Sequence, residues 1–164
     1  MTTSLLILCT HNSARSVLAE AMLNHWASKL GKDVRAYSAG SAPSGRINPH
    51  ALQVLAAAGV DTSAARSKSW DEFAAPDAPK MDLIITVCDN AAGEVCPYWP
   101  GQPATAHWGY PDPSEGEGSD AQKLEAFRQT LHAMRRRLEL LVNLPTEKLA
   151  KLSLQQSAKE LAGS

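Results

Sequence analysis

Residues 4–16 read Ser4-Leu5-Leu6-Ile7-Leu8-Cys9-Thr10-His11-Asn12-Ser13-Ala14-Arg15-Ser16, and they are the most informative stretch of the chain. Its apolar half, residues 5–8, is short and bounded by polar side chains, which is typical of a buried strand. From Ser13 to about Leu30, apolar side chains recur at helical spacing until Gly31 ends the pattern. The stretch therefore predicts a strand, a tight turn that begins at Cys9, and the first turns of a helix.

The turn places a cysteine and an arginine, with five residues between them, at the start of that helix. Backbone N–H groups at a helix N-terminus bind anions, and a cysteine there is more readily a thiolate. The Arg15 guanidinium suits two oxygens of an oxyanion, and Asn12 suits a left-handed backbone position that curls the loop. We therefore predict that Cys9 is a nucleophile aimed at the central atom of a bound oxyanion. The predicted oxyanion-binding residues are Thr10, His11, Asn12, Ser13, Ala14, Arg15 and Ser16.

The rest of the chain alternates strand and helix patterns. Strands are predicted over residues 34–39, 82–87 and 104–108, and helices over 49–58 and 120–144, with a short helical turn at 69–73. Such alternation predicts an α/β protein of three layers, with a four-stranded parallel sheet flanked by helices. Ligands of such sheets bind beyond the carboxyl ends of the strands. We expect Cys9, Cys88 and the segment after Trp108 to meet at that edge.

The composition is that of an ordinary globular protein. The chain has 164 residues, 44% of them hydrophobic and 20% charged, with a net charge of −1. No basic excess favours nucleic acid, and the apolar run near the N-terminus is too short for a signal peptide or a membrane span. We expect a cytoplasmic protein that binds neither nucleic acid nor membrane, with one domain over residues 1–145 and a helical tail over 146–164.

Three cysteines are present: Cys9, Cys88 and Cys96. An odd number without an export signal argues against a disulfide framework. They could be buried core thiols, but Cys9 ends a strand, and the other two flank a loop that contains glycine and asparagine. A zinc site is less favoured because Cys88 and Cys96 lack zinc-ligand spacing. No metal is expected.

Asp112 is the second candidate for catalysis. It stands between Pro111 and Pro113 on a stiff segment after a predicted strand. A carboxyl group there could protonate an oxygen that leaves when sulfur attacks. Pro-Asp-Pro is also ordinary turn chemistry, so the residue types alone leave both interpretations open.

The run from Cys9 to Glu20 resembles the phosphate-binding loop of the low-molecular-weight protein tyrosine phosphatase superfamily, and within it the branch of thiol-linked arsenate reductases. Three further segments agree: Tyr37-Ser38-Ala39-Gly40, Asp61-Thr62-Ser63 with Arg66-Ser67-Lys68, and His107-Trp108-Gly109-Tyr110-Pro111-Asp112-Pro113. The resemblance implies the superfamily fold, with Cys9 as nucleophile, Arg15 as oxyanion ligand and Asp112 as general acid.

The resemblance also implies a reduction by thiols, without a bound cofactor. Cys9 attacks arsenate, Cys88 attacks the Cys9–arsenic adduct and releases arsenite, and Cys96 takes over the disulfide. An external reductant, thioredoxin or glutathione with a glutaredoxin, then restores the thiols. Residues 88–97 resemble the redox segment of thioredoxin-coupled arsenate reductases, with a spacing one residue longer than usual. Ala14 stands where many relatives have a second cysteine.

Two other functions stay open. One is a phosphatase that hydrolyses phosphotyrosine through a Cys9 phosphocysteine, with Cys88 and Cys96 purely structural. The other is a non-catalytic module that binds an oxyanion or senses redox state. Relatives that act on phosphotyrosine usually have tyrosines after the aspartate, whereas Ser114-Glu115-Gly116 follows here, which favours arsenate. The intact set of Cys9, Arg15 and Asp112 argues against a non-catalytic module.

A last expectation concerns Lys68. Some relatives bind potassium through residues that match Asn12, Glu20 and Ser38, together with an acidic residue near position 68. Lys68 occupies that position in this sequence. We expect its ammonium group to replace the ion by pairing with Glu20.

Overall fold

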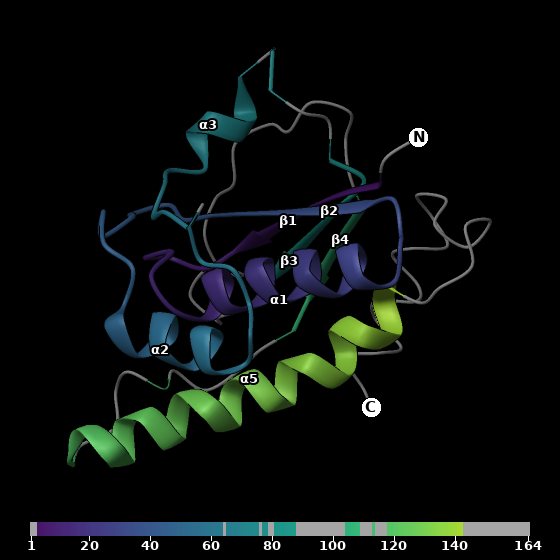
Figure 1. Cartoon of the computed structure of the whole chain (residues 1–164). Coiled ribbons are helices and arrows are strands. Elements are labelled where there is room, and N and C mark those ends of the chain that lie inside the picture. Colours follow the sequence, from purple (N-terminus) through teal and green to yellow (C-terminus); the bar gives the residue numbers. More distant parts are fainter. Residues whose placement is uncertain are drawn as a thin grey trace.

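A computed structural model describes residues 3–63, 65–75, 77–78, 81–87, 104–108, 113 and 118–142. Within them, four strands form one parallel sheet in the order β2-β1-β3-β4 (Figure 1). The strands are β1 (Thr3–Leu8), β2 (Val34–Ala39), β3 (Leu83–Thr86) and β4 (Ala104–His107). In the register, Leu5 of β1 lies between Ala36 of β2 and Leu83 of β3. The predicted four-stranded parallel sheet is confirmed.

Helices cover both faces of the sheet and make three layers. α1 (Arg15–Lys29), α2 (Pro49–Ala57) and α5 (Asp120–Val142) lie on one face, and the short α3 (Asp71–Ala74) lies on the other (Figure 1). Side chains of β1 alternate between the faces, as expected for a strand. Leu5 and Ile7 belong to the larger apolar cluster with α1 and α5, whereas Leu6 and Leu8 join a smaller cluster with Phe73 of α3.

Local sequence explains where the helices begin. α2 starts after Asn48, whose side-chain oxygen accepts the N–H of His50 at 2.9 Å, and Pro49 takes the first helical position. α1 starts at Arg15 after Ala14, which has no side-chain oxygen for the first N–H groups of the helix. The start of α1 thus differs from that of α2 in lacking a cap from its own sequence.

The long helix α5 packs along α1 and α2 through the apolar stripe that the sequence predicted. Its buried members are Phe127, Leu131, Met134, Leu138 and Leu141, whereas Leu124 is only partly buried. Truncating one of these side chains to alanine typically costs about 2–5 kcal/mol. The helix ends at Val142, and the tail predicted from residue 146 lies outside the described residues, so the division at residue 145 stays a prediction.

Among the described residues, none of the helices is both long and apolar enough to span a bilayer.

Candidate active site

The turn after β1 places Cys9 at the carboxyl edge of the sheet. Cys9 is buried, and its backbone N–H donates to the Ala39 carbonyl at 3.2 Å. Gly40 packs directly on this turn, because a Cβ there would lie 2.3 Å from the Thr10 carbonyl oxygen. Only glycine permits so close an approach of the two backbones. The end of β2 therefore supports the turn that holds Cys9.

Asn12 holds the loop in its curled form. Its φ angle is 46°, the left-handed region that the sequence predicted, and its side chain is fully buried. The amide nitrogen donates to Ser16 Oγ at 2.8 Å and to Ser38 Oγ at 3.0 Å. The amide oxygen accepts the backbone N–H of Lys68 at 2.9 Å. These three hydrogen bonds offset the cost of the left-handed conformation, about 1–3 kcal/mol.

Carbonyl groups of the loop are bound by the segments around it. The Thr10 carbonyl accepts the N–H of Ala42 at 2.9 Å, and the His11 carbonyl accepts from Ser67 Oγ at 3.1 Å. The Ser13 carbonyl accepts the N–H of Asn48 at 2.8 Å. A trans peptide points its N–H opposite to its carbonyl, and no peptide among the described residues is cis. The N–H groups that follow these carbonyls therefore turn to the other side of the loop, where an oxyanion can accept them.

Behind the loop lies a buried ion pair between Lys68 and Glu20. Lys68 Nζ is 3.4 Å from Glu20 Oε1, and the two side chains are 6% and 15% exposed. The ammonium also donates to Ser38 Oγ at 3.5 Å and to the Arg66 carbonyl at 3.3 Å. Burial raises the pKa of the Glu20 carboxyl and lowers the pKa of the Lys68 ammonium. The predicted pairing of Lys68 with Glu20 is confirmed.

Comparison with known proteins identifies the family. Residues 4–156 match the family described as low molecular weight phosphotyrosine protein phosphatase. The chain belongs to this family. It is 37% identical over 133 residues to a protein of Halalkalibacterium halodurans named arsenate reductase. The matched region covers 80% of this chain and 89% of that relative.

Two solved structures resemble this member of the family. The arsenate reductase of Archaeoglobus fulgidus superposes with a TM-score of 0.65 at 28% identity, covering 85% of this chain and 99% of that one. A protein of Corynebacterium glutamicum described as a thioredoxin-dependent arsenate reductase has a TM-score of 0.54 at 29% identity. That match covers 85% of this chain and 63% of the other. Both likenesses agree with the α/β phosphatase-like fold predicted from the sequence.

The ends of three strands meet beside the phosphatase-family loop, as the sequence predicted. The Val87 N–H donates to the Leu8 carbonyl at 3.0 Å, and the Trp108 N–H donates to the Thr86 carbonyl at 2.7 Å. The chain therefore leaves β1, β3 and β4 at one edge of the sheet. Cys88, Cys96 and Asp112 lie outside the described residues, and their roles stay predictions.

Two hydrogen bonds to the loop were not predicted from the sequence. Ser67 binds the His11 carbonyl from a segment 56 residues away, and the backbone N–H of Asn48 binds the Ser13 carbonyl. Gly40 carried a usable signal, because a glycine directly after a strand often marks a close backbone approach. Ser67 carried no comparable signal, since nothing local relates it to the loop.

Proposed function

We propose that this chain is an arsenate reductase whose nucleophile is the Cys9 thiolate. One observation carries the proposal: Cys9 begins a loop whose carbonyl groups are bound outward, at the uncapped start of α1. Arg15 is the first residue of that helix and provides a planar fork for two oxyanion oxygens. The positive end of the helix dipole favours both the thiolate and the bound arsenate.

The first step joins sulfur to arsenic. The Cys9 sulfur attacks As(V), an S–As bond forms, and one As–O bond breaks. Asp112 gives a proton to the departing oxygen, which leaves as water. Ser16 Oγ accepts a hydrogen bond from Asn12, so its own O–H is available to donate to the sulfur before the attack.

The second step is the reduction. The Cys88 thiolate attacks the Cys9 sulfur, and the electron pair of the S–As bond passes to arsenic, which becomes As(III). Arsenite leaves, and Cys9 and Cys88, which have supplied the two electrons, are joined in a disulfide. Position 14 of the loop, where many relatives have a second cysteine, is Ala14 in this chain. The thiol that attacks the Cys9 sulfur must therefore come from another segment.

Recovery of the thiols needs an external reductant. Cys96 attacks Cys88 and moves the disulfide to a Cys88–Cys96 pair, which thioredoxin then reduces. The Corynebacterium relative described as thioredoxin-dependent supports thioredoxin over glutathione with a glutaredoxin. We propose that the protein needs no bound cofactor and works in the cytoplasm, where such thiols are kept reduced.

Hydrolysis of phosphotyrosine is the second candidate, and the match to the phosphotyrosine phosphatase family favours it. Its first step is the same attack by Cys9, now on phosphorus, with Asp112 protonating the phenolic oxygen. Ser114-Glu115-Gly116 supplies no aromatic side chain for the aryl group, which is why arsenate is preferred.

The two functions are separated by assaying both on one preparation. Arsenate is supplied with thioredoxin, thioredoxin reductase and NADPH, while hydrolysis of an aryl phosphate is followed in parallel. We expect NADPH loss that depends on arsenate and disappears in Cys9→Ser. Fast aryl hydrolysis without arsenate-dependent NADPH loss would establish the phosphatase instead. Cys96→Ser tests the relay, and unchanged turnover with thioredoxin would remove Cys96 from it.

A further inference from the structure

A recess of about 670 Å³ lies along the free edge of β2. We call it the β2 recess. α1 provides one wall, and residues 60–73 provide the other. Neither Cys9 nor Arg15 lines it, so it is separate from the catalytic loop. Its volume is within the range of small-molecule sites, roughly 300–1,000 Å³.

The charges in the β2 recess do not cancel. Its two ion pairs are satisfied internally: Lys68 with Glu20, and Arg66 with Glu72. The remaining carboxylate, Asp61, accepts the N–H of Ser63 at 2.9 Å. Two further cations, Lys29 and Arg35, line the recess without a carboxylate within 4.0 Å in the part of the chain that the structure describes. Its four cations, Lys29, Arg35, Arg66 and Lys68, outnumber its three carboxylates, Glu20, Asp61 and Glu72, so the recess carries an excess of one positive charge.

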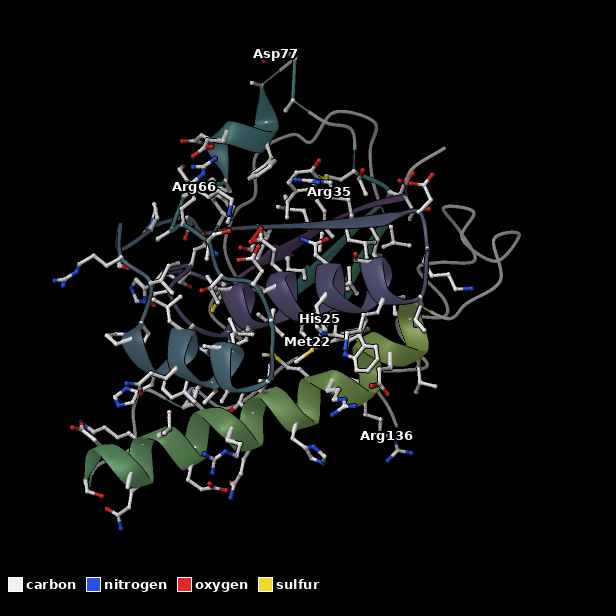
Figure 2. The ribbon with its side chains drawn as sticks, in the orientation of Figure 1. Met22, His25, Arg35, Arg66, Asp77 and Arg136 are labelled. Carbon is white, nitrogen blue, oxygen red and sulfur yellow. The ribbon has the colours of Figure 1, made fainter. Side chains whose placement is uncertain are left out.

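Aromatic side chains lie next to this charge. The Arg35 guanidinium is 5.3 Å from the centroid of the Tyr37 ring. The Tyr37 ring in turn lies 5.5 Å from the Phe73 ring, tilted by 55°. Figure 2 shows Arg35 and Arg66 on one side of β2 and His25 on the other, toward α1. A flat ring can contact Tyr37 while its anionic group reaches the guanidinium.

An extended peptide is a poor candidate for this edge. Exposed edge strands can accept another strand, but that requires free backbone N–H and carbonyl groups. At the middle of β2, the Asn24 side chain accepts the Ala36 N–H at 2.8 Å and donates to the Ala36 carbonyl at 3.0 Å. This pair of hydrogen bonds occupies the outer edge of the strand, which favours a small molecule over a peptide.

We propose that the β2 recess is a binding site for a small aromatic anion, separate from the oxyanion site at Cys9. Arg35 binds the anionic group, and Tyr37 contacts the ring. A carboxylate, sulfonate or phosphate on the ring satisfies this chemistry equally.

The proposal is tested by titrating the full-length protein with 8-anilinonaphthalene-1-sulfonate in saturating phosphate, and following its fluorescence. Phosphate fills the catalytic loop, so the expected result is saturable binding of one probe per chain. Arg35→Ala is expected to weaken this binding about tenfold or more, since a hydrogen bond to a charged group contributes about 1.5–3 kcal/mol. Tyr37→Leu is expected to weaken it further when combined with Arg35→Ala.

Arg136→Ala is the matched control, because Arg136 is an exposed arginine on α5, far from Arg35 in Figure 2. It is expected to leave the probe affinity unchanged. Arg35 is also exposed, so its substitution is expected to leave the thermal unfolding midpoint unchanged. Unchanged affinity in Arg35→Ala, equal losses in both arginine variants, or no saturable binding of the probe in saturating phosphate would each overturn the proposal.

Discussion

Residues 66–72 take part in two ion pairs, and the pair with the longer N–O distance is the more buried. Arg66 and Glu72 form the closer pair, with two hydrogen bonds of 3.0 and 2.7 Å, but their side chains are 60% and 43% exposed. Lys68 and Glu20 are 3.4 Å apart, and their side chains are only 6% and 15% exposed. Water and salt screen the first pair, whereas the second has lost most of its solvent.

Connection to the loop that begins at Cys9 is the second difference. The backbone N–H of Lys68 binds the Asn12 amide, and its ammonium contacts Ser38, which Asn12 also binds. Arg66 and Glu72 contact no residue of the loop in the described interactions. The buried pair thus helps to hold the loop that begins at Cys9, whereas the exposed pair lies on the surface. Variants of the two pairs are therefore expected to differ in their effects on stability and turnover.

Lys68→Met breaks the buried pair and is expected to have the largest effect. It leaves the Glu20 carboxylate buried without a partner, so the free energy of unfolding is expected to fall by about 3–5 kcal/mol. Urea unfolding measures this. Lys68→Met combined with Glu20→Leu is expected to recover most of the loss, because an apolar pair can replace a buried ion pair. A single variant as stable as wild type would show that burial of this pair has been overstated.

Asn12→Ala removes the amide that links the pair to the loop. Its loss strands the Lys68 N–H in a buried position, and the free energy of unfolding is expected to fall by about 2–3 kcal/mol. Arsenate turnover is expected to fall as well, because the left-handed turn loses its support. Asn24→Ala is the control: it also removes an amide with two backbone hydrogen bonds, but on the outer edge of β2. If both variants lowered turnover equally, Asn12 would have no special connection to the site.

Arg66→Ala and Glu72→Gln test the exposed pair. Their coupling energy in a double-mutant cycle is expected to be at most about 1 kcal/mol, and to shrink in high salt. The same cycle on Lys68 and Glu20 is expected to give a larger, salt-insensitive value. Equal coupling energies for the two pairs would remove the distinction between them.

At acid pH, the contributions of Glu20 and Glu72 to the free energy of unfolding are expected to change with pH in opposite directions. Burial raises the pKa of Glu20, so its contribution to stability is full below about pH 4.3 and is lost as the pH rises through the folded-state pKa. The hydrogen bonds from Arg66 lower the pKa of Glu72, so its contribution is full above that pH and is lost as the pH falls through its folded-state pKa. Unfolding free energies of Glu20→Gln and Glu72→Gln, each relative to wild type, are therefore expected to change with pH in opposite directions. Parallel pH curves would contradict the assignment.

Local patterns predicted most of the fold. The apolar runs that became β1, β2 and β3 and the stripe of α5 depend on neighbouring residues, and the parallel order follows from the alternation of elements. The pairing of Lys68 with Glu20 joins residues 48 positions apart, and only the resemblance to a family indicated it.

Other features could not be read from the chain because they depend on packing between distant segments. The binding of Ala36 by Asn24 and the β2 recess exist only once α1 and residues 60–73 meet at the edge of β2. The sequence also does not predict which ion pair is buried, because Arg66 and Lys68 are both basic residues in the same polar segment. Asp112, Cys88 and Cys96 stay predictions, since they lie outside the described residues.

A single turnover without any external reductant tests whether the thiols of this chain reduce arsenate. The reduced protein is mixed with excess arsenate, arsenite is quantified, and free thiols and disulfide-linked peptides are determined by mass spectrometry. Reduction of As(V) takes two electrons, so we predict one arsenite per chain, the loss of two thiols, and a disulfide that contains Cys88. Absence of arsenite with all three thiols intact, in a preparation that hydrolyses an aryl phosphate, would contradict the account.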